Sequence, residues 1–160
     1  SQAFEMEDFT HFERGRRPTV MFAGMMRYDG DLMLPREVLV GAPVFHNCMS
    51  ELLCATGKRS IAIAETQKFG HVTYFWNGNR SEPFDAALEQ AIEIPSELGH
   101  FDRRPWMKAA EVTDAAIAAI TAKADTGIGP RYHQVRINYA NGDMVGHTGD
   151  LDATIVAVCA

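Results

Sequence analysis

SIAIAETQKFGH, residues 60–71, is the stretch that decides the fold. Its first part, 60–64, is an apolar run whose length and composition favour a buried strand. The residues that follow are ambiguous, because 72–76 favours a strand by composition while the apolar residues of 65–76 recur at helical spacing. We predict a helix there. A buried strand that leads directly into a helix is the repeating unit of α/β proteins.

Strand and helix patterns alternate on both sides of this stretch. Towards the amino terminus, 19–25 predicts a strand and 46–56 predicts a helix that Gly57 ends. Towards the carboxyl terminus, the patterns predict in chain order a strand at 91–94, a helix at 107–123, a strand at 134–139, a loop at 141–147 and a helix from Thr148 onward. This alternation predicts an α/β sheet that is covered by helices on both faces.

The composition indicates a globular chain and argues against several classes of partner. The 160 residues include 15 basic and 21 acidic side chains, for a net charge of −6. Bulk charge of this sign does not hold nucleic acid or an anionic membrane, so we expect neither partner. The apolar run at 155–160 is far shorter than the roughly 20 residues of a membrane helix. Cys48, Cys54 and Cys159 lack CxxC spacing, which predicts reduced thiols packed in the core of a cytoplasmic protein.

Both ends of the chain predict an internal segment of a longer protein. The sequence has no initiating Met, and residues 1–9 have the pattern of the last turns of a helix. The last predicted helix runs through apolar residues 154–160 without a polar cap, Gly or Pro to end it. A connector at 41–43 is the expected domain boundary, because Pro43 disfavours helix before it and Gly41 loosens the backbone.

Asp143 and His147 form one candidate site. They follow a predicted strand, and α/β proteins gather their chemistry at the carboxyl ends of strands. Neighbouring glycines disfavour a helix, so we predict that a sharply folded loop brings the two side chains together. A carboxylate and an imidazole suit Mn²⁺, Mg²⁺, Co²⁺ or Zn²⁺, although two ligands are too few for a closed site. The alternative is an ordinary loop in which Asp143 accepts from backbone amides and His147 caps the next helix.

Lys68 forms the second candidate site. It lies just after the buried strand at 60–64, where an ammonium group can hold a phosphate as a point charge. A solvated surface lysine is the alternative that the sequence alone favours. His71 has the pattern of a core histidine more than of a third metal ligand. Residues 77–80 predict a turn, from which Arg80 could reach an anion.

Two long motifs resemble those of the cofactor-independent phosphoglycerate mutases. They are AETQKFGHVTYFWNGNR, residues 64–80, and VRINYANGDMVGHTG, residues 135–149. Shorter matches at 22–25, 28–31 and 93–96 extend the resemblance over nearly the whole chain. Among these enzymes, the resemblance is to the plant and kinetoplastid branch.

The resemblance implies how the chain is divided. Residues 1–40 would be the carboxyl-terminal tail of a phosphotransferase domain, 41–43 a hinge, and 44–160 part of a metal-binding phosphatase domain. The phosphatase part would be an α/β three-layer sandwich of the alkaline phosphatase superfamily. This hinge coincides with the connector that Gly41 and Pro43 predict.

The resemblance also implies an activity and its cofactors. Enzymes of this family interconvert 3-phosphoglycerate and 2-phosphoglycerate in glycolysis and gluconeogenesis through a phosphoserine intermediate. They use two divalent metal ions, Mn²⁺, Mg²⁺ or Co²⁺, and no 2,3-bisphosphoglycerate. Asp143 and His147 match two ligands of one metal, and Lys68 matches the lysine that contacts the substrate phosphate. The resemblance further implies a monomeric, cytoplasmic enzyme.

The nucleophilic serine of the family does not match any serine of this chain. It belongs to an upstream segment, and the motif is absent around Ser50, Ser60, Ser81 and Ser96. We therefore expect the isolated 160 residues to have no mutase activity. Two alternatives stay open: a non-catalytic or truncated module, and another metal-dependent phosphatase or phosphomutase of the same superfamily.

Overall fold

The chain divides into two compact units, Ser1–Val44 and Phe45–Ala160. The computed structural model describes residues 1–30, 32–41 and 43–160. The predicted hinge at 41–43 includes Ala42, which lies outside the described residues, as does Asp31 of the match at 28–31. The assignment of the two units to a phosphotransferase and a phosphatase domain stays a prediction.

The first unit contains little regular structure. Its elements are α1 (Gln2–Glu5), β1 (Ala23–Gly24) and β2 (Glu37–Val38), and the two short strands pair in parallel. The strand predicted at 19–25 is therefore confirmed for two residues only. The Glu5 carboxylate accepts a hydrogen bond from the backbone of the residue before β2, at 2.9 Å. This contact ties the helix to the strand pair.

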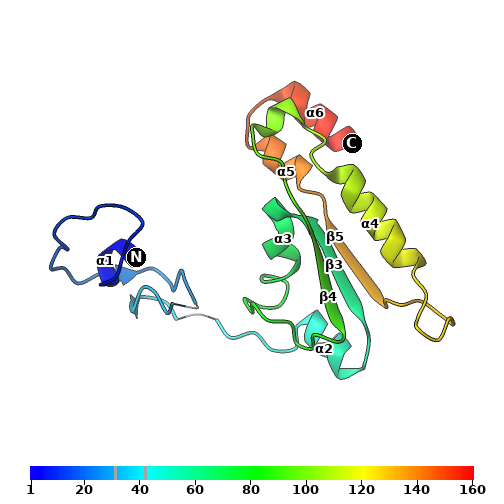
Figure 1. Cartoon of the computed structure of the whole chain (residues 1–160), viewed down its shortest axis with the longest axis horizontal. Helices are drawn as coiled ribbons and strands as arrows, with labels where there is room; N and C mark the ends of the chain where they lie inside the picture. Colours follow the sequence, from blue (N-terminus) through cyan, green and yellow to red (C-terminus); the bar gives the residue numbers. More distant parts are fainter. Residues whose placement is uncertain (31, 42) are drawn as a thin grey trace. The chain divides into compact units, whose positions relative to one another are not determined.

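The second unit is built on a parallel sheet of three strands in the order β4-β3-β5 (Figure 1). These strands are β3 (Ser60–Glu65), β4 (Glu89–Ile94) and β5 (Gln134–Asn138). The first residue of β3 pairs with the first residue of each neighbour, so the three strands begin together, and β5 ends one residue before the other two. The strands predicted at 60–64, 91–94 and 134–139 are confirmed within two residues at each end.

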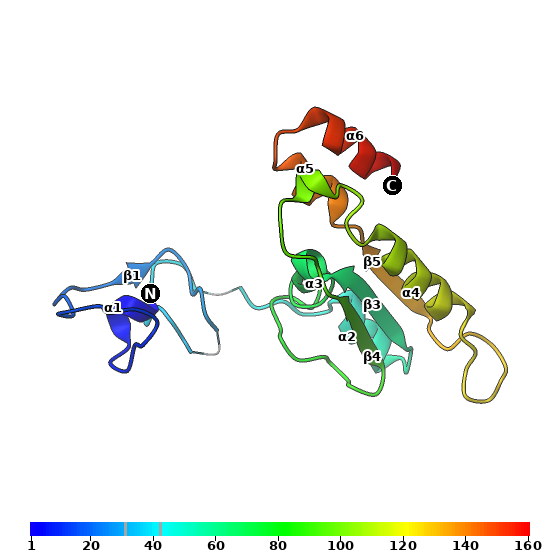
Figure 2. The ribbon, with the colours of Figure 1, turned by 45° about the horizontal axis from the view of Figure 1, so that its top comes forward.

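Helices cover both faces of this sheet, which confirms the predicted α/β class (Figures 1 and 2). Successive side chains of β3 point to opposite faces. The isoleucines of β3 pack on Val112 of α4 (Ala109–Thr121), and its buried alanines pack on Val72 of α3 (Thr66–Val72). The remaining predicted helix near the strand starts is α2 (Met49–Ala55). Because both faces are buried, β3 is apolar along nearly its whole length.

Three further elements gather beyond the carboxyl ends of the strands. They are η1 (Phe101–Arg103), α5 (Asn141–Gly146) and α6 (Leu151–Cys159). They share a small core around Val145, which is fully buried. The predicted helix after Thr148 is confirmed and begins at Leu151, because the Asp150 carboxylate accepts a hydrogen bond from the Ala153 amide at 2.9 Å. This cap turns the chain sharply after α5.

The loop predicted at 141–147 is wrong, because this segment is the helix α5. The two glycines of α5 cost about 2 kcal/mol together relative to alanine. Burial of Val145 against Met107, Ala153 and Ala157 offsets that cost, since one buried valine contributes about 1.5–3 kcal/mol. Tertiary packing therefore overrides the local preference.

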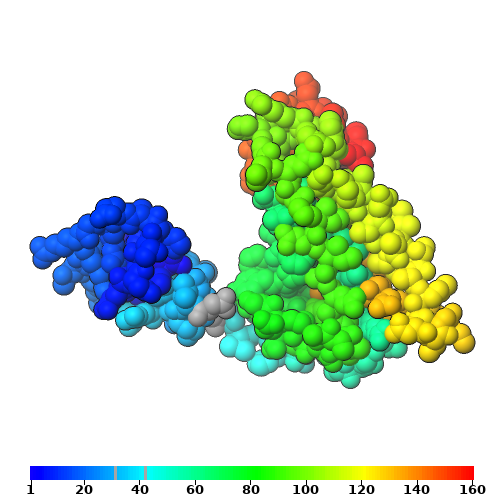
Figure 3. Space-filling model, viewed as in Figure 1, coloured from blue at the N-terminus to red at the C-terminus, as the bar shows by residue number. Residues whose placement is uncertain are grey.

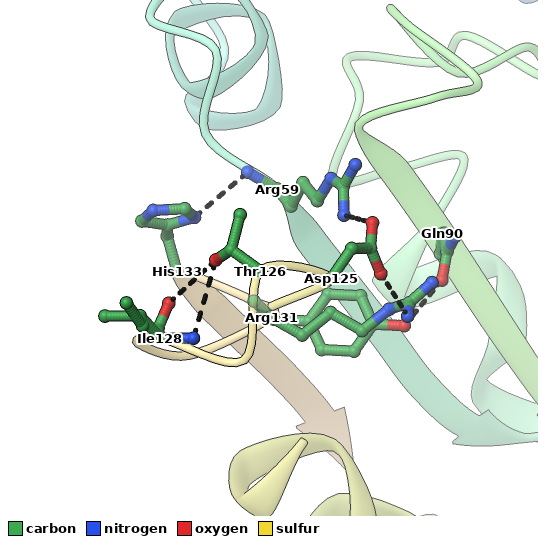
Figure 4. A network of polar contacts seen from close by, with 8 residues as sticks. Arg59, Gln90, Asp125, Thr126, Ile128, Arg131 and His133 are labelled. Atoms are coloured by element: carbon green, nitrogen blue, oxygen red, sulfur yellow. Dashed lines mark hydrogen bonds and ion pairs between the residues drawn. The ribbon is translucent and has the colours of Figure 1, made fainter. Parts of the chain in front are cut away.

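Polar contacts hold the opposite end of the sheet together (Figure 4). The Asp125 carboxylate lies 3.1 Å from the Arg59 guanidinium and 3.2 Å from that of Arg131. The Arg59 amide donates to Nδ1 of His133 at 3.2 Å. These contacts fasten the long connection between α4 and β5 to the start of β3.

α4 forms one flank of the second unit (Figure 3). Apolar side chains remain exposed along this helix. Ile117 and Ile120 are exposed there. Cys159 is also exposed, so the prediction that it packs in the core is wrong; Cys48 and Cys54 are half-buried. Within the described ranges, no helix combines the length and apolarity that a membrane crossing requires.

Candidate active site

Lys68, Asp143 and His147 meet at the carboxyl end of the sheet. Lys68 lies in the first turn of α3, directly after β3. Asp143 lies on α5, which follows β5, and His147 is the C-cap residue of that helix. β3 and β5 are neighbours, so their following segments emerge side by side (Figure 2). Here parallel pairing brings together residues that are 75 positions apart in sequence.

Asp143 is the centre of the cluster. Its Oδ2 atom forms an ion pair and hydrogen bond with Nζ of Lys68, and its Oδ1 atom lies 3.3 Å from Nε2 of His147. His147 follows directly after α5 and keeps a helical conformation, so its spacing of four residues places it on the same face as Asp143. The exposed fraction of the side chain is 12% for Lys68, 50% for Asp143 and 76% for His147. The lysine stem is therefore covered while the acid and imidazole face solvent.

The contact with Lys68 keeps Asp143 ionised. The hydrogen bond from Lys68 lowers the pKa of the Asp143 carboxyl below its ordinary value, and the charge of Lys68 acts in the same direction. An ionised carboxylate offers two oxygen atoms to a cation or a proton donor. Asp143 is thus held in the form that a metal ligand needs.

His71 lies one turn beyond Lys68 on α3 and is exposed. Its ring makes an edge contact with that of Phe75, with ring centres 5.3 Å apart. The prediction of a core histidine is therefore wrong. The spacing of three residues from Lys68 on a helix is the signal that could have placed His71 near the cluster.

A comparison with known families identifies the chain's family. The model of the metalloenzyme superfamily matches residues 11–160. The chain belongs to this superfamily. A metalloenzyme agrees with the carboxylate and imidazole that α5 presents together.

The relatives of this metalloenzyme chain reported below are all named as the same kind of enzyme. A "2,3-bisphosphoglycerate-independent phosphoglycerate mutase" of Trypanosoma brucei brucei is 51% identical over 99% of the chain. A "Probable 2,3-bisphosphoglycerate-independent phosphoglycerate mutase 2" of Arabidopsis thaliana is 48% identical over 98%. A crystal structure of Leishmania mexicana phosphoglycerate mutase at low cobalt concentration matches 98% of the chain with a TM-score of 0.79 and 52% identity. These names confirm the resemblance that the two motifs indicate.

The match covers only part of each relative. The chain spans 27% of the length of the Trypanosoma and Arabidopsis proteins and 27% of the Leishmania chain. The α/β fold and the superfamily are therefore shown for these residues, and an activity of the whole protein is a proposal.

The donor atoms at Asp143 and His147 fit part of a divalent metal site. Carboxylate oxygen and imidazole nitrogen are ligands for Mn²⁺, Co²⁺ and Zn²⁺. The ammonium group of Lys68 already places a positive charge against this carboxylate. Among the described residues, no three His, Cys, Asp or Glu side chains are grouped so that they could hold a metal ion. This chain therefore offers two ligands, and their role as ligands stays a prediction.

Glu65 is a feature of the site region that the motifs left without a role. It ends β3, three residues before Lys68, and its exposed fraction is 2%. Burial raises the pKa of the Glu65 carboxyl, although the Ser96 hydroxyl and the backbone and charge of Lys108 act against this rise. A charged residue at the end of an apolar strand was the signal in the sequence.

Proposed function

We propose that the protein containing this chain interconverts 3-phosphoglycerate and 2-phosphoglycerate without 2,3-bisphosphoglycerate, through a phosphoserine intermediate. The observation that carries the proposal is the cluster of Lys68, Asp143 and His147 at the carboxyl end of the sheet, in a chain whose relatives bear this activity in their names. An activity of this kind belongs to glycolysis and gluconeogenesis.

Each residue of the cluster has a proposed role. Asp143 on α5 and His147 at the end of that helix are two ligands of one divalent metal, and their contact shows that both can face one ion. Bound divalent metal supplies Lewis acidity towards phosphoryl oxygen atoms. Lys68 contributes a point charge that holds an oxygen of the substrate phosphate. Its covered stem limits the positions that the ammonium group can take.

The serine that accepts the phosphoryl group is proposed to lie outside these 160 residues. Ser50 and Ser60 are fully buried, which supports excluding them as nucleophiles. Ser96 is engaged at the start of α3, where its hydroxyl lies 3.4 Å from the Gln67 amide. The isolated chain is therefore proposed to lack mutase activity.

The metal and the compartment are part of the proposal. We infer two divalent ions in the complete enzyme, with Mn²⁺, Mg²⁺ or Co²⁺ as candidates; the cobalt in the Leishmania structure supports a divalent metal. The free thiols of Cys48, Cys54 and Cys159 fit a reducing compartment such as the cytoplasm. We expect a monomer without nucleic acid or membrane partners.

The test compares the full-length protein with the 160-residue chain. Metal-stripped samples of both receive 3-phosphoglycerate, with Mn²⁺, Mg²⁺ or Co²⁺ added singly and 2,3-bisphosphoglycerate absent. We expect metal-dependent formation of 2-phosphoglycerate by the full-length protein and none by the chain. Hydrolysis to free phosphate without 2-phosphoglycerate would indicate a phosphatase instead. Robust turnover by the isolated chain would contradict the proposal that the serine lies elsewhere.

A further inference from the structure

Both oxygen atoms of the Asp143 carboxylate have partners in this structure. Oδ2 forms an ion pair with the ammonium group of Lys68, and Oδ1 lies 3.3 Å from Nε2 of His147. The Lys68 side chain reaches Asp143 across the junction of α3 and α5, and only 12% of it is exposed. The lysine is therefore directed at the carboxylate by its packing, unlike a solvated surface lysine.

A divalent cation and this ammonium group compete for one carboxylate. Two positive charges a few ångströms apart repel each other strongly where water is partly excluded. A metal that binds Asp143 also needs oxygen lone pairs at coordination distance, and the ammonium group lies on one of these oxygens. The more favourable arrangement places the metal on the carboxylate and moves the ammonium group away.

We propose that Lys68 is an exchangeable counter-ion of Asp143, which neutralises the carboxylate until a divalent metal displaces it and releases the ammonium group towards the substrate phosphate. This inference rests on the proposed function and adds a sequence of events to it. The ammonium group of Lys68 cannot contact the Asp143 carboxylate and the substrate phosphate fully at the same time. Metal binding at Asp143 would therefore come before the contact between Lys68 and the phosphate.

The first test measures Mn²⁺ binding by calorimetry to the metal-stripped full-length protein. Lys68→Met keeps a covered, uncharged stem, and Lys58→Met is the matched control, since Lys58 is exposed and lies before the start of β3. We expect Lys68→Met to bind Mn²⁺ at this site at least about threefold more tightly than wild type, which is the scale of losing one partly exposed ion pair. Lys58→Met should bind as wild type does. Equal or weaker binding by Lys68→Met would overturn the inference.

The same titration in an Asp143→Asn background separates the inference from the proposed function. We expect this change to weaken Mn²⁺ binding and to remove the difference between Lys68 and Lys68→Met. If Asp143→Asn weakens binding but Lys68→Met brings no gain, the counter-ion role fails and the metal site stands. If Asp143→Asn leaves Mn²⁺ binding unchanged, the metal site and the counter-ion role both fail.

A second measurement needs no variant and so does not depend on variant folding. Wild-type protein is treated briefly with acetic anhydride with and without Mn²⁺, and acetylation of Lys68 relative to Lys58 is measured by mass spectrometry. Release of the ammonium group predicts that Mn²⁺ raises the relative labelling of Lys68. Unchanged or reduced labelling would contradict displacement.

Discussion

Asp143 shows how much of a site can depend on one side chain. Its two oxygen atoms contact Lys68 of α3 and His147 at the end of α5. The sequence spacing of Asp143 and His147 indicates a ligand pair, but their pairing with Lys68 depends on contacts between β3 and β5. The predictions at this scale concern single side chains.

The proposed metal ligands predict a loss of metal-dependent activity. In the full-length protein, Asp143→Ala or His147→Ala should abolish the activation of mutase turnover by Mn²⁺ or Co²⁺, because each change removes a donor atom. The measurement is the initial rate of 2-phosphoglycerate formation against metal concentration. Activation that matches wild type in either variant would rule out the ligand role of that residue.

Lys68 predicts a selective loss of phosphate binding. Lys68→Ala should weaken substrate binding or turnover by at least about tenfold, because a charge-assisted hydrogen bond contributes about 1.5–3 kcal/mol. Lys58→Ala serves as the control at an exposed position. The measurement is kcat and KM for 3-phosphoglycerate in both variants. Equal effects of the two substitutions would remove the special role of Lys68.

Glu65 predicts a pH dependence of stability. Because burial raises the pKa of Glu65 in the folded state, the Glu65 carboxyl binds a proton more tightly in the folded protein than in the unfolded chain. The protonated carboxyl therefore stabilises the fold. This stabilisation is complete below the ordinary pKa of a glutamate, about 4.3, and is lost as the pH rises through the folded pKa. Glu65→Gln should therefore raise the free energy of unfolding at pH 7 relative to wild type and flatten its decline above pH 4.

Urea unfolding at several pH values checks this prediction. Glu82→Gln is the control, since Glu82 is exposed. If Glu65→Gln and wild type show parallel pH profiles, the carboxyl group is not perturbed as described.

At the scale of elements, α5 is the helix that local preference did not predict. Gly142 and Gly146 weaken a helix locally, but Val145 is fully buried against α6 and the loop that carries Met107. Asn141 adds a hydrogen bond from its side chain to the Ala157 carbonyl. These contacts stabilise a helix of two turns that would not persist alone.

The helical state of α5 predicts that an alanine is tolerated at Gly142. A Cβ atom there has no neighbour within 4 Å, so Gly142→Ala should raise the free energy of unfolding by about 0.4–1 kcal/mol. Gly149 is the contrasting position, because its φ of +78° disfavours any side chain, and Gly149→Ala should lower stability by about 1–2 kcal/mol. Urea unfolding measures both. Destabilisation by Gly142→Ala would contradict the helix.

At the scale of the whole second unit, a buried ion pair joins the strands to the helix that carries Lys68. The Arg136 guanidinium of β5 donates to the Glu89 carboxylate of β4 at 2.7 Å and to the Val72 carbonyl at the end of α3, also at 2.7 Å. The Asn77 amide donates to the same carboxylate at 2.9 Å. The contact with Val72 fixes the end of α3 to β5, and the contact with Glu89 links the same arginine to β4.

Breaking this pair predicts a large loss of stability. Arg136→Met leaves the Glu89 carboxylate buried without its cation, which should lower the free energy of unfolding by about 3–5 kcal/mol. The double change Arg136→Met with Glu89→Gln removes the uncompensated charge and should recover part of that loss. Chemical unfolding of the three proteins measures both effects. If Arg136→Met lowers the free energy of unfolding by less than about 1 kcal/mol, the pair does not hold α3 against the sheet.

The sequence by itself determined the α/β class and the three strands of the second unit. Hydrophobic runs and helical spacing report burial locally, and the motifs at 64–80 and 135–149 indicate the family through their resemblance. That resemblance singled out Lys68, Asp143 and His147, and the structure places them close together, while their roles stay predictions.

Only the tertiary structure decided that 141–147 is helical, that His71 faces solvent and that Lys68 neutralises Asp143. Each of these depends on partners distant in sequence. The burial of Val145 against α6 overrides the preference of its neighbouring glycines, and the pairing of β3 with β5 brings the lysine to the carboxylate. Local sequence patterns do not report the free energy of such contacts, because the contacts form only when separate elements pack together.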